Sequence, residues 1–132
     1  MSTLRVNTLA NQGGTQSTAI ENAINGSAKA WVNFNGTGTV AIRASYNVSS
    51  ITDNNTGDYT VNFTNAMSDK NYAVNVSTSS IYGVAWSGAS GLFSEAAAAT
   101  EVTPTTTAFR FGTRNSSVAV ADVKYACVAI FR

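Results

Sequence analysis

The feature that most constrains this chain is a strict alternation of apolar and polar side chains. Along residues 59–64 the odd positions hold Tyr, Val and Phe, and the even positions hold Thr, Asn and Thr. A β-strand points successive side chains to opposite faces, so this period of two predicts a strand with one buried face. Residues 72–76 repeat the pattern after the turn-forming run Ser68–Asn71. The two runs therefore predict neighbouring strands of one meander.

The same alternation predicts a β-hairpin shortly after residue 30. Trp31, Asn33 and Asn35 share one side of its first strand, and Val32 and Phe34 share the other. The sequence NGTGT follows and supplies the glycines and asparagine that tight turns need. The apolar side of this hairpin is expected to face the core.

Three further strands are predicted in the remainder of the chain. They cover residues 46–51, 108–112 and 118–131, where apolar and polar residues again alternate. Asp122 interrupts the alternation of the last run, which predicts a β-bulge at Ala121–Asp122.

These segments favour an all-β fold. About seven to nine short strands, spaced by roughly 8 to 12 residues, are typical of an antiparallel β-sandwich or a compact barrel. The aromatic residues at inward strand positions are expected to fill its core. They are Tyr59, Phe63, Tyr72, Phe109, Phe111 and Tyr125.

The first 29 residues differ from the rest of the chain. Val6 and Leu9 lie in an extended segment that precedes two glycines. We therefore expect residues 1–29 to form an N-terminal arm, and residues 30–132 to form the β-sandwich domain. An apolar arm of this kind is suited to docking on another protein, where it would gain order.

One short helix is predicted within the arm, over residues 18–25. Ser17 or Thr18 would serve as its N-cap, and Gly26 would lie just past its end. Two helical turns are not stable alone, so this helix must pack on the β domain or on another subunit.

Length and charge limit the function classes. The chain has 132 residues, enough for one domain, and only 11% of them are charged, against about 25% in typical soluble domains. With a net charge of +1 and scattered basic residues, nucleic-acid binding is not expected. The N-terminus lacks the apolar core of a signal peptide, and no run is long enough to span a membrane. We expect synthesis in a cytoplasm without membrane insertion.

The residue types argue against an enzyme. The chain has no histidine, which removes the commonest general base and most zinc sites. Its single cysteine, Cys127, lies in an apolar run and is expected to be buried and unreactive. We expect no catalytic residue, no metal and no cofactor.

Two acidic residues near one turn permit other interpretations. Asp53 and Asp58 flank the sequence NNTG, and a glycosidase needs a pair of carboxylates. Asp53, Asn55 and Asp58 also offer oxygen ligands of the kind that Ca²⁺ prefers. The favoured interpretation is structural, because Asp residues at a tight turn accept backbone hydrogen bonds.

Three aromatic residues are candidates for a contact surface. Tyr82, Trp86 and Phe93 lie in an irregular, glycine-rich region instead of a regular strand. They would either anchor this region to the core or to a neighbouring subunit, or stack against a glycan.

The run AKAWVNFNGTGTVAIRASYNVSSITDNNTGDYTVNFTNAMSDKNYAV, from Ala28 to Val74, resembles a segment of tail-fibre and related virion proteins of tailed bacteriophages, especially marine, cyanophage-type ones. The closing YACVAIFR is similar to the last strand of the same domain. The resemblance implies a homotrimeric β domain of the kind that ends a longer fibre chain. Only about 30 residues precede the domain here, which is expected to leave no room for a fibre shaft.

The resemblance and the residues together predict a non-enzymatic structural protein on the surface of a tailed-phage virion. It would be a capsid-decorating knob or a tail-fibre-tip-like module that contacts the host. Its expected partners are other virion proteins, reached through residues 1–29, two further copies of itself, and a host surface glycan. The apolar Trp31 side and the region 80–100 would supply the subunit contacts.

The alternative is a soluble carbohydrate-binding β-sandwich that uses Tyr82 or Trp86. A small hydrolase is a third and less favoured reading, because the chain has no histidine.

Overall fold

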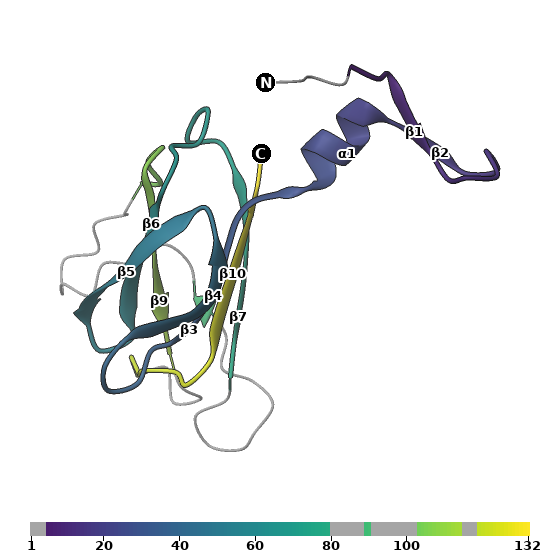
Figure 1. Cartoon of the computed structure of the whole chain (residues 1–132). Helices are drawn as coiled ribbons and strands as arrows, with labels where there is room; N and C mark the ends of the chain where they lie inside the picture. Colours follow the sequence, from purple (N-terminus) through teal and green to yellow (C-terminus); the bar gives the residue numbers. More distant parts are fainter. Residues whose placement is uncertain (1–4, 80–88, 91–102, 115–118) are drawn as a thin grey trace.

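The computed structural model describes residues 5–79, 89–90, 103–114 and 119–132, and it confirms the all-β fold as a sandwich. Two four-stranded antiparallel sheets face each other, with strand orders β4-β3-β10-β7 and β5-β6-β9-β8 (Figure 1). The elements in chain order are β1 (Thr8–Ala10), β2 (Ser17–Ala19), α1 (Ile20–Gly26), β3 (Ala28–Asn35), β4 (Ala41–Tyr46), β5 (Val48–Asn55), β6 (Asp58–Phe63), β7 (Ala73–Thr78), β8 (Ala89–Ser90), β9 (Ala108–Thr113) and β10 (Ala126–Phe131).

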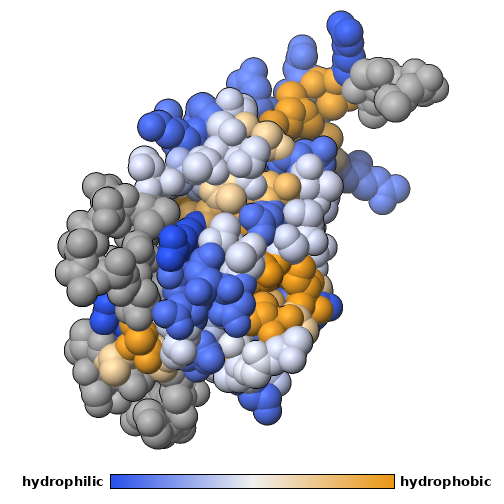
Figure 2. Space-filling view, turned by 90° about the vertical axis from the view of Figure 1, so that its left-hand side faces the viewer, coloured by the Kyte–Doolittle hydropathy of each residue, from blue (hydrophilic) through white to orange (hydrophobic). Residues whose placement is uncertain are grey.

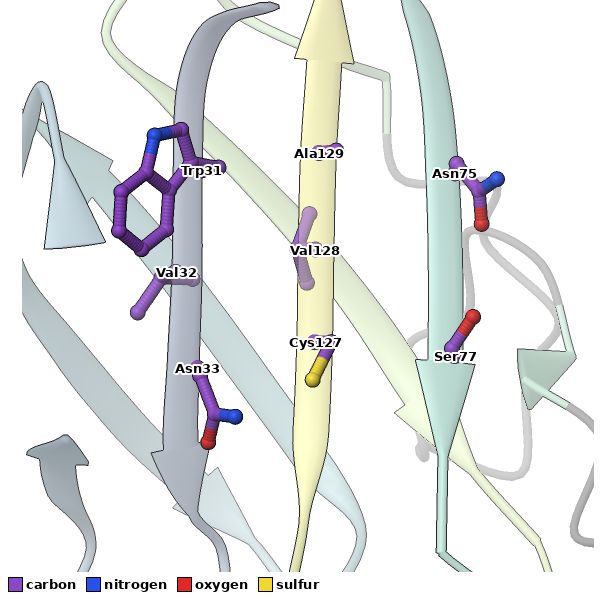
Figure 3. Close-up of a pocket in the computed structure, with 8 residues that line it drawn as sticks. All are labelled: Trp31, Val32, Asn33, Asn75, Ser77, Cys127, Val128 and Ala129. Carbon is purple, nitrogen blue, oxygen red and sulfur yellow. The ribbon is translucent and has the colours of Figure 1, made fainter. Parts of the chain in front are cut away.

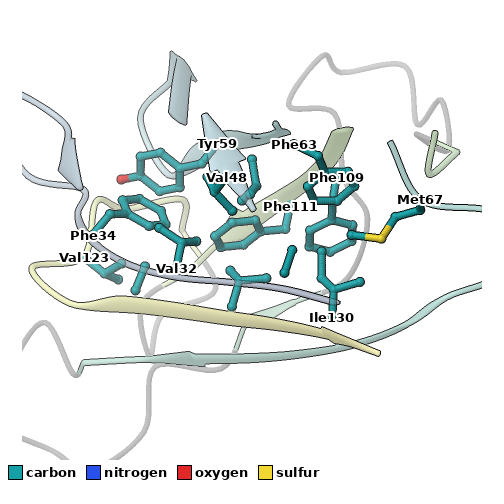
Figure 4. Close-up of a cluster of buried hydrophobic side chains, with 14 residues drawn as sticks. Val32, Phe34, Val48, Tyr59, Phe63, Met67, Phe109, Phe111, Val123 and Ile130 are labelled. Carbon is teal, nitrogen blue, oxygen red and sulfur yellow. The ribbon is translucent and has the colours of Figure 1, made fainter. Parts of the chain in front are cut away.

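The core lies between the two sheets, where the inward side chains of both meet (Figure 4). Aromatic rings form its centre: the Phe34 and Tyr59 rings meet edge to face, with centroids 5.2 Å apart, and Phe109 stacks on Phe111 at 5.8 Å. Such ring pairs stabilise the fold beyond the area they bury. The predicted inward positions are confirmed for four aromatic residues, namely Tyr59, Phe63, Phe109 and Phe111.

The two outer members of the predicted aromatic core behave differently. Tyr72 is half-buried and packs against the core beside Phe63. Tyr125 was expected inside but is 47% exposed, with the Arg43 guanidinium 4.1 Å above its ring centroid. The reason is phase: the inward positions of this run are Ala126, Val128 and Ile130, so Tyr125, like Cys127, falls on the outward side.

The last predicted strand is also shorter than expected. Among the described residues 119–131, only Ala126–Phe131 form a strand, and Val120 makes an isolated bridge to Arg114. The predicted bulge at Ala121–Asp122 is wrong, because this stretch does not lie in a strand ladder. Asp122 instead accepts hydrogen bonds from the opposite sheet, as described below.

Asn47 forms the corner where the chain passes from one sheet to the other. Its φ of 54° is left-handed, a conformation that Asn tolerates better than most residues. β4 ends before it and β5 begins after it, so the single strand predicted for residues 46–51 is wrong. The Asn47 amide fixes the corner by donating to the Lys29 carbonyl at 3.0 Å and accepting from the Asn65 backbone N–H at 2.8 Å.

The predicted hairpin of β3 and β4 is confirmed, with Asn35 opposite Ala41, and Val32 and Phe34 are buried as expected. The predicted meander of residues 59–64 and 72–76 is wrong, because β6 and β7 belong to different sheets. β10 instead fills the place between β3 and β7 and pairs with both.

The N-terminal segment, residues 5–27, contains the β1–β2 hairpin and α1, which lie to one side of the sandwich (Figure 1). None of its described residues is buried. The helix begins later than predicted: Ala19 occupies the N-cap without a side-chain hydrogen bond, and Gly26 is the last helical residue. The missing cap and the seven-residue length make this a helix of low intrinsic stability.

Candidate functional site

The outer face of the sheet β4-β3-β10-β7 carries an open groove of about 330 Å³. Two rows of side chains from three neighbouring strands line it, and we call it the outer-face groove (Figure 3). Strand register places the residues of each row directly opposite one another. The first row is Trp31, Ala129 and Asn75, and the second is Asn33, Cys127 and Ser77.

The groove exists because the middle strand carries small side chains. Ala129 and Cys127 project from β10 between the larger residues of β3 and β7 (Figure 3). The Trp31 indole, 41% exposed, forms one wall, and the side chains of Asn75 and Ser77 form the other. Its volume falls at the lower end of the range for small-molecule sites, about 300–1,000 Å³.

The lining of the groove is largely apolar, and its polar groups are uncharged. The Arg43 Nη1 group lies 3.3 Å from Asn33 Oδ1, which directs the Asn33 amide nitrogen to act as a donor elsewhere. The side chains of Asn75 and Ser77 make no hydrogen bond to the described residues. The groove therefore presents an aromatic face together with amide and hydroxyl groups, a set suited to stacking and hydrogen bonding.

Cys127 differs from its prediction. The thiol was expected in the core, but the inward positions of β10 are Ala126, Val128 and Ile130, so Cys127 points to the outer face and is half-buried. It forms part of the groove floor.

The sequence-predicted contact residues Tyr82, Trp86 and Phe93 lie outside the described residues, and their role stays a prediction. The groove relies on Trp31, whose outward direction the alternation did predict. Sequence reasoning missed Asn75 as a site residue. The alternation of residues 72–76 predicted that Asn75 lies on the polar side of its strand. No local pattern indicated that Asn75 and Trp31 would lie in one row, with β10 between their strands.

Asp58 directly follows the β5–β6 turn, where Asn54 Nδ2 donates to its Oδ1 at 3.2 Å, and it is also buried in an ion pair with Arg110 that was not predicted. Its exposed fraction is 1%, and Arg110 donates to it through Nε at 2.8 Å and through Nη2. The hydrogen bond to this carboxylate also raises the pKa of Arg110. Asp53 lies at an exposed position of β5.

This pairing bears on the calcium and glycosidase interpretations. Asp58 is already neutralised by a guanidinium and is closed to solvent, so it is not free to bind Ca²⁺ or to react with a substrate. Among the described residues, no group of three acidic, His or Cys side chains is placed to hold a metal ion.

A second buried polar cluster surrounds the Tyr59 hydroxyl. The phenol oxygen lies 2.8 Å from Asp122 Oδ1 and 2.9 Å from the Gly36 carbonyl oxygen, and the Gly57 N–H donates to Asp122 at 2.7 Å. Burial, followed by the Asp122 carboxylate, raises the pKa of Tyr59. A fully buried phenol that keeps its proton serves structure, so this cluster ties three loops together at one end of the sandwich.

A second hollow, of about 340 Å³, lies where the N-terminal segment joins the sandwich. Tyr46, Lys29 and Arg132 line it. Both cations already have partners: Lys29 donates to Ser27 Oγ at 3.0 Å and to the Ile24 carbonyl, and Arg132 pairs with Asp69. The hollow is therefore part of the junction and offers no free charge to a ligand.

The N-terminal segment exposes three large apolar side chains. Val6, Leu9 and Ile24 are 36%, 46% and 55% exposed. Figure 2 shows hydrophobic residues beside the grey N-terminal end, where this segment lies. Large apolar side chains gathered on a small element with no buried residue are typical of a protein contact.

Comparison of the chain with protein-family models, with curated proteins and with solved structures found no match. Within the described part of the chain, no helix has the length and apolar character needed to cross a membrane. The function is therefore inferred from the residues and geometry given above.

Proposed function

We propose that this chain is a non-enzymatic structural protein on the surface of a tailed-phage virion. Residues 1–29 attach it to another virion protein, and the sandwich of residues 30–132 is displayed as a capsid knob or as a tail-fibre-tip-like contact module. The resemblance of Ala28–Val74 supports the type of particle. The observation that carries the attachment is the contrast between a closed sandwich and an N-terminal segment without a single buried residue.

The physical chemistry of the N-terminal segment favours docking. Each exposed apolar side chain gains about 25 cal/mol per Å² when a partner removes it from water. Val6, Leu9 and Ile24 offer such area, and α1 is too short to be stable by itself. A partner surface would bury these side chains and order the helix at the same time.

The homotrimer implied by the resemblance is part of this proposal. β4 supports it: the strand lies at the edge of its sheet, all six of its residues are exposed, and Ile42 and Tyr46 are among them. Exposed edge strands with apolar residues readily pair with another chain. Sedimentation at micromolar concentration should give a trimer, which Ile42→Lys weakens; a monomeric wild type would remove this part of the proposal.

The decisive experiment locates the protein in purified virions of the phage that encodes it. Immunogold labelling or cryo-EM density on heads favours the capsid knob, and density on tails favours the fibre-tip module. Absence of the chain from purified particles overturns the proposal. Saccharide binding by a protein that never enters particles would support the alternative, a soluble carbohydrate-binding β-sandwich.

A deletion of residues 1–27 tests the attachment separately. Because the described part of this segment buries no residue, the shortened chain should keep the free energy of unfolding within about 0.5 kcal/mol of the full chain. It should nevertheless be lost from particles. The matched control is Lys70→Ala, at an exposed position of the sandwich outside both β4 and the N-terminal segment, which should enter particles normally. Particles that incorporate the deletion variant normally would show that attachment lies elsewhere.

A further inference from the structure

We propose that the outer-face groove binds a neutral glycan, with one sugar ring packed against the Trp31 indole and its hydroxyls bonded across the groove to Asn75 and Ser77. This site is distinct from the predicted residues Tyr82 and Trp86. It goes beyond attachment to a virion and does not depend on it.

Trp31 supplies the apolar half of the recognition. A pyranose ring has faces of C–H groups and an edge of hydroxyls, so it is apolar on its faces and polar at its rim. The indole is 41% exposed on the outer face, and its register partner on β10 is the small residue Ala129. A flat aromatic surface of this kind packs against C–H groups, and its N–H remains available as a donor.

The opposite wall supplies the polar half. Asn75 offers an amide donor and acceptor, Ser77 offers a hydroxyl, and neither side chain has a partner among the described residues. Asn33 adds a donor on the Trp31 side, because Arg43 bonds its carbonyl oxygen. An apolar surface with a few polar groups that fix orientation is the usual make-up of a small-molecule site.

The absence of charged side chains among the described residues of the groove favours a neutral ligand. None of the residues that line the groove is acidic or basic. The nearest guanidinium, that of Arg43, is already bonded to Asn33 and to the Lys124 carbonyl at 2.7 Å and covers the Tyr125 ring. A phosphate or carboxylate would leave water without gaining a free cation, which is unfavourable.

The groove is preformed. Its floor is β10, which is paired on both sides, and its walls are the adjoining strands β3 and β7. Sites built on paired strands lose little conformational entropy on binding. A ligand would meet side chains that the sheet already holds in register.

The proposal is tested by titrating the ¹⁵N-labelled full chain with a panel of neutral gluco-, galacto- and manno-oligosaccharides. The expected result is a shift of the Trp31 indole N–H signal and of the backbone amides of Asn75 and Ala129. Trp86→Phe assigns the indole signal of Trp31, since the chain has two tryptophans. A panel in which no sugar shifts these signals overturns the proposal.

Two variants connect binding to the groove. Trp31→Ala should weaken affinity by about tenfold or more, which corresponds to about 1.4 kcal/mol. Ala129→Leu should abolish binding by filling the floor from an outward position, without entering the core. Ala41→Leu, at an exposed site on β4 outside the groove, is the matched control and should bind normally. Circular dichroism and thermal unfolding check that each variant is folded.

Two other results would also overturn the proposal. Loss of binding in Trp86→Ala, with Trp31→Ala unaffected, would move the glycan to the region predicted from the sequence. An indole signal of Trp31 that shifts with protein concentration alone would show that a second copy covers the groove. Neither result depends on whether the protein is found in virions, so the two proposals fail separately.

Discussion

The carboxylate of Asp122 lies 2.8 Å from the phenol oxygen of Tyr59, although 63 positions separate the two residues in the chain. The same carboxylate oxygen accepts the Gly57 N–H, and the Tyr59 hydroxyl also reaches the Gly36 carbonyl. Loops from both sheets are therefore held by one buried cluster. Asp122 breaks the apolar alternation of its run because it supplies the acceptor for this cluster.

Removing the Tyr59 hydroxyl should destabilise the sandwich. Tyr59→Phe keeps the ring in the core but removes the hydroxyl proton that Asp122 and the Gly36 carbonyl share, which leaves Asp122 Oδ1 with the Gly57 N–H alone. An unsatisfied buried acceptor costs about 1–3 kcal/mol, and we expect the free energy of unfolding in urea to fall by that amount. Tyr46→Phe is the control, since Tyr46 is 58% exposed and should change little. Equal effects in the two variants would contradict the buried cluster.

Stability should fall at alkaline pH through two tyrosines. Burial raises the pKa of Tyr72 to about 12, and burial followed by Asp122 raises that of Tyr59. Both contributions are fully present below the unfolded pKa of about 10. Above it, the unfolded chain loses these protons while the folded chain keeps them, so the free energy of unfolding decreases as pH rises.

The measurement is the slope of the free energy of unfolding against pH. Urea unfolding between about pH 9 and about pH 12 should show a steeper loss for the wild type than for Tyr72→Phe, because the variant lacks one of the two titrating phenols. Tyr72→Phe also removes a donor to the Thr105 and Ala108 carbonyls, each 3.1 Å away, so its stability is compared with its own value near pH 8. Identical slopes would show that Tyr72 does not contribute.

The ion pair of Asp58 and Arg110 should be sensitive to loss of one partner. Asp58 is 1% exposed, so Arg110→Met leaves a buried carboxylate without its cation. We expect a loss of about 3 kcal/mol in urea unfolding, the lower end of the range for broken buried pairs, because the Arg110 side chain is 29% exposed.

Two further variants test whether the loss of stability comes from leaving a buried charge unpaired. The double substitution Asp58→Asn with Arg110→Met should recover part of the loss, since no charge is left buried. The solvent-exposed pair of Asp69 and Arg132 is the matched control, and Arg132→Met should have little effect. A similar loss in Arg110→Met and Arg132→Met would contradict the importance of burial.

Two glycines with nearly equal φ angles should respond differently to substitution by alanine. Gly57 and Gly38 have φ values of 65° and 63°, so both substitutions carry the left-handed strain of about 1–2 kcal/mol. A Cβ at Gly57 would also lie 2.7 Å from the Thr113 carbonyl oxygen, whereas one at Gly38 meets no atom within 4 Å. Gly57→Ala should therefore lower the urea midpoint much further than Gly38→Ala. A difference near zero would show that the loops around Gly57 move apart easily.

Local patterns predicted the faces of the strands well and their partners poorly. Alternation correctly placed Val32 and Phe34 inside and Trp31 outside, because side-chain direction depends only on the neighbouring residues of the same strand. It wrongly joined residues 59–64 to residues 72–76, which belong to different sheets. Partner choice depends on closure of the core between the sheets, and a local period contains no information about that closure.

The partners of buried polar residues were also not predictable from local patterns. Asp58 next to Gly57 was read as turn chemistry, and Gly57 does adopt the left-handed conformation of a turn. The ion pair of Asp58 required Arg110, which lies on the adjoining strand of the sheet and 52 positions further along the chain. No spacing rule in the sequence links the two residues.

The sequence by itself determined that this chain forms short antiparallel strands and that Trp31 and Asn33 point outward, since both follow from a period of two. The tertiary structure decided that Asn75 and Ser77 lie across a groove from them. That arrangement depends on β10, which forms backbone hydrogen bonds to β3 on one side and to β7 on the other. The outer-face groove therefore arises from long-range strand pairing, which becomes favourable only when both sheets close over a common core.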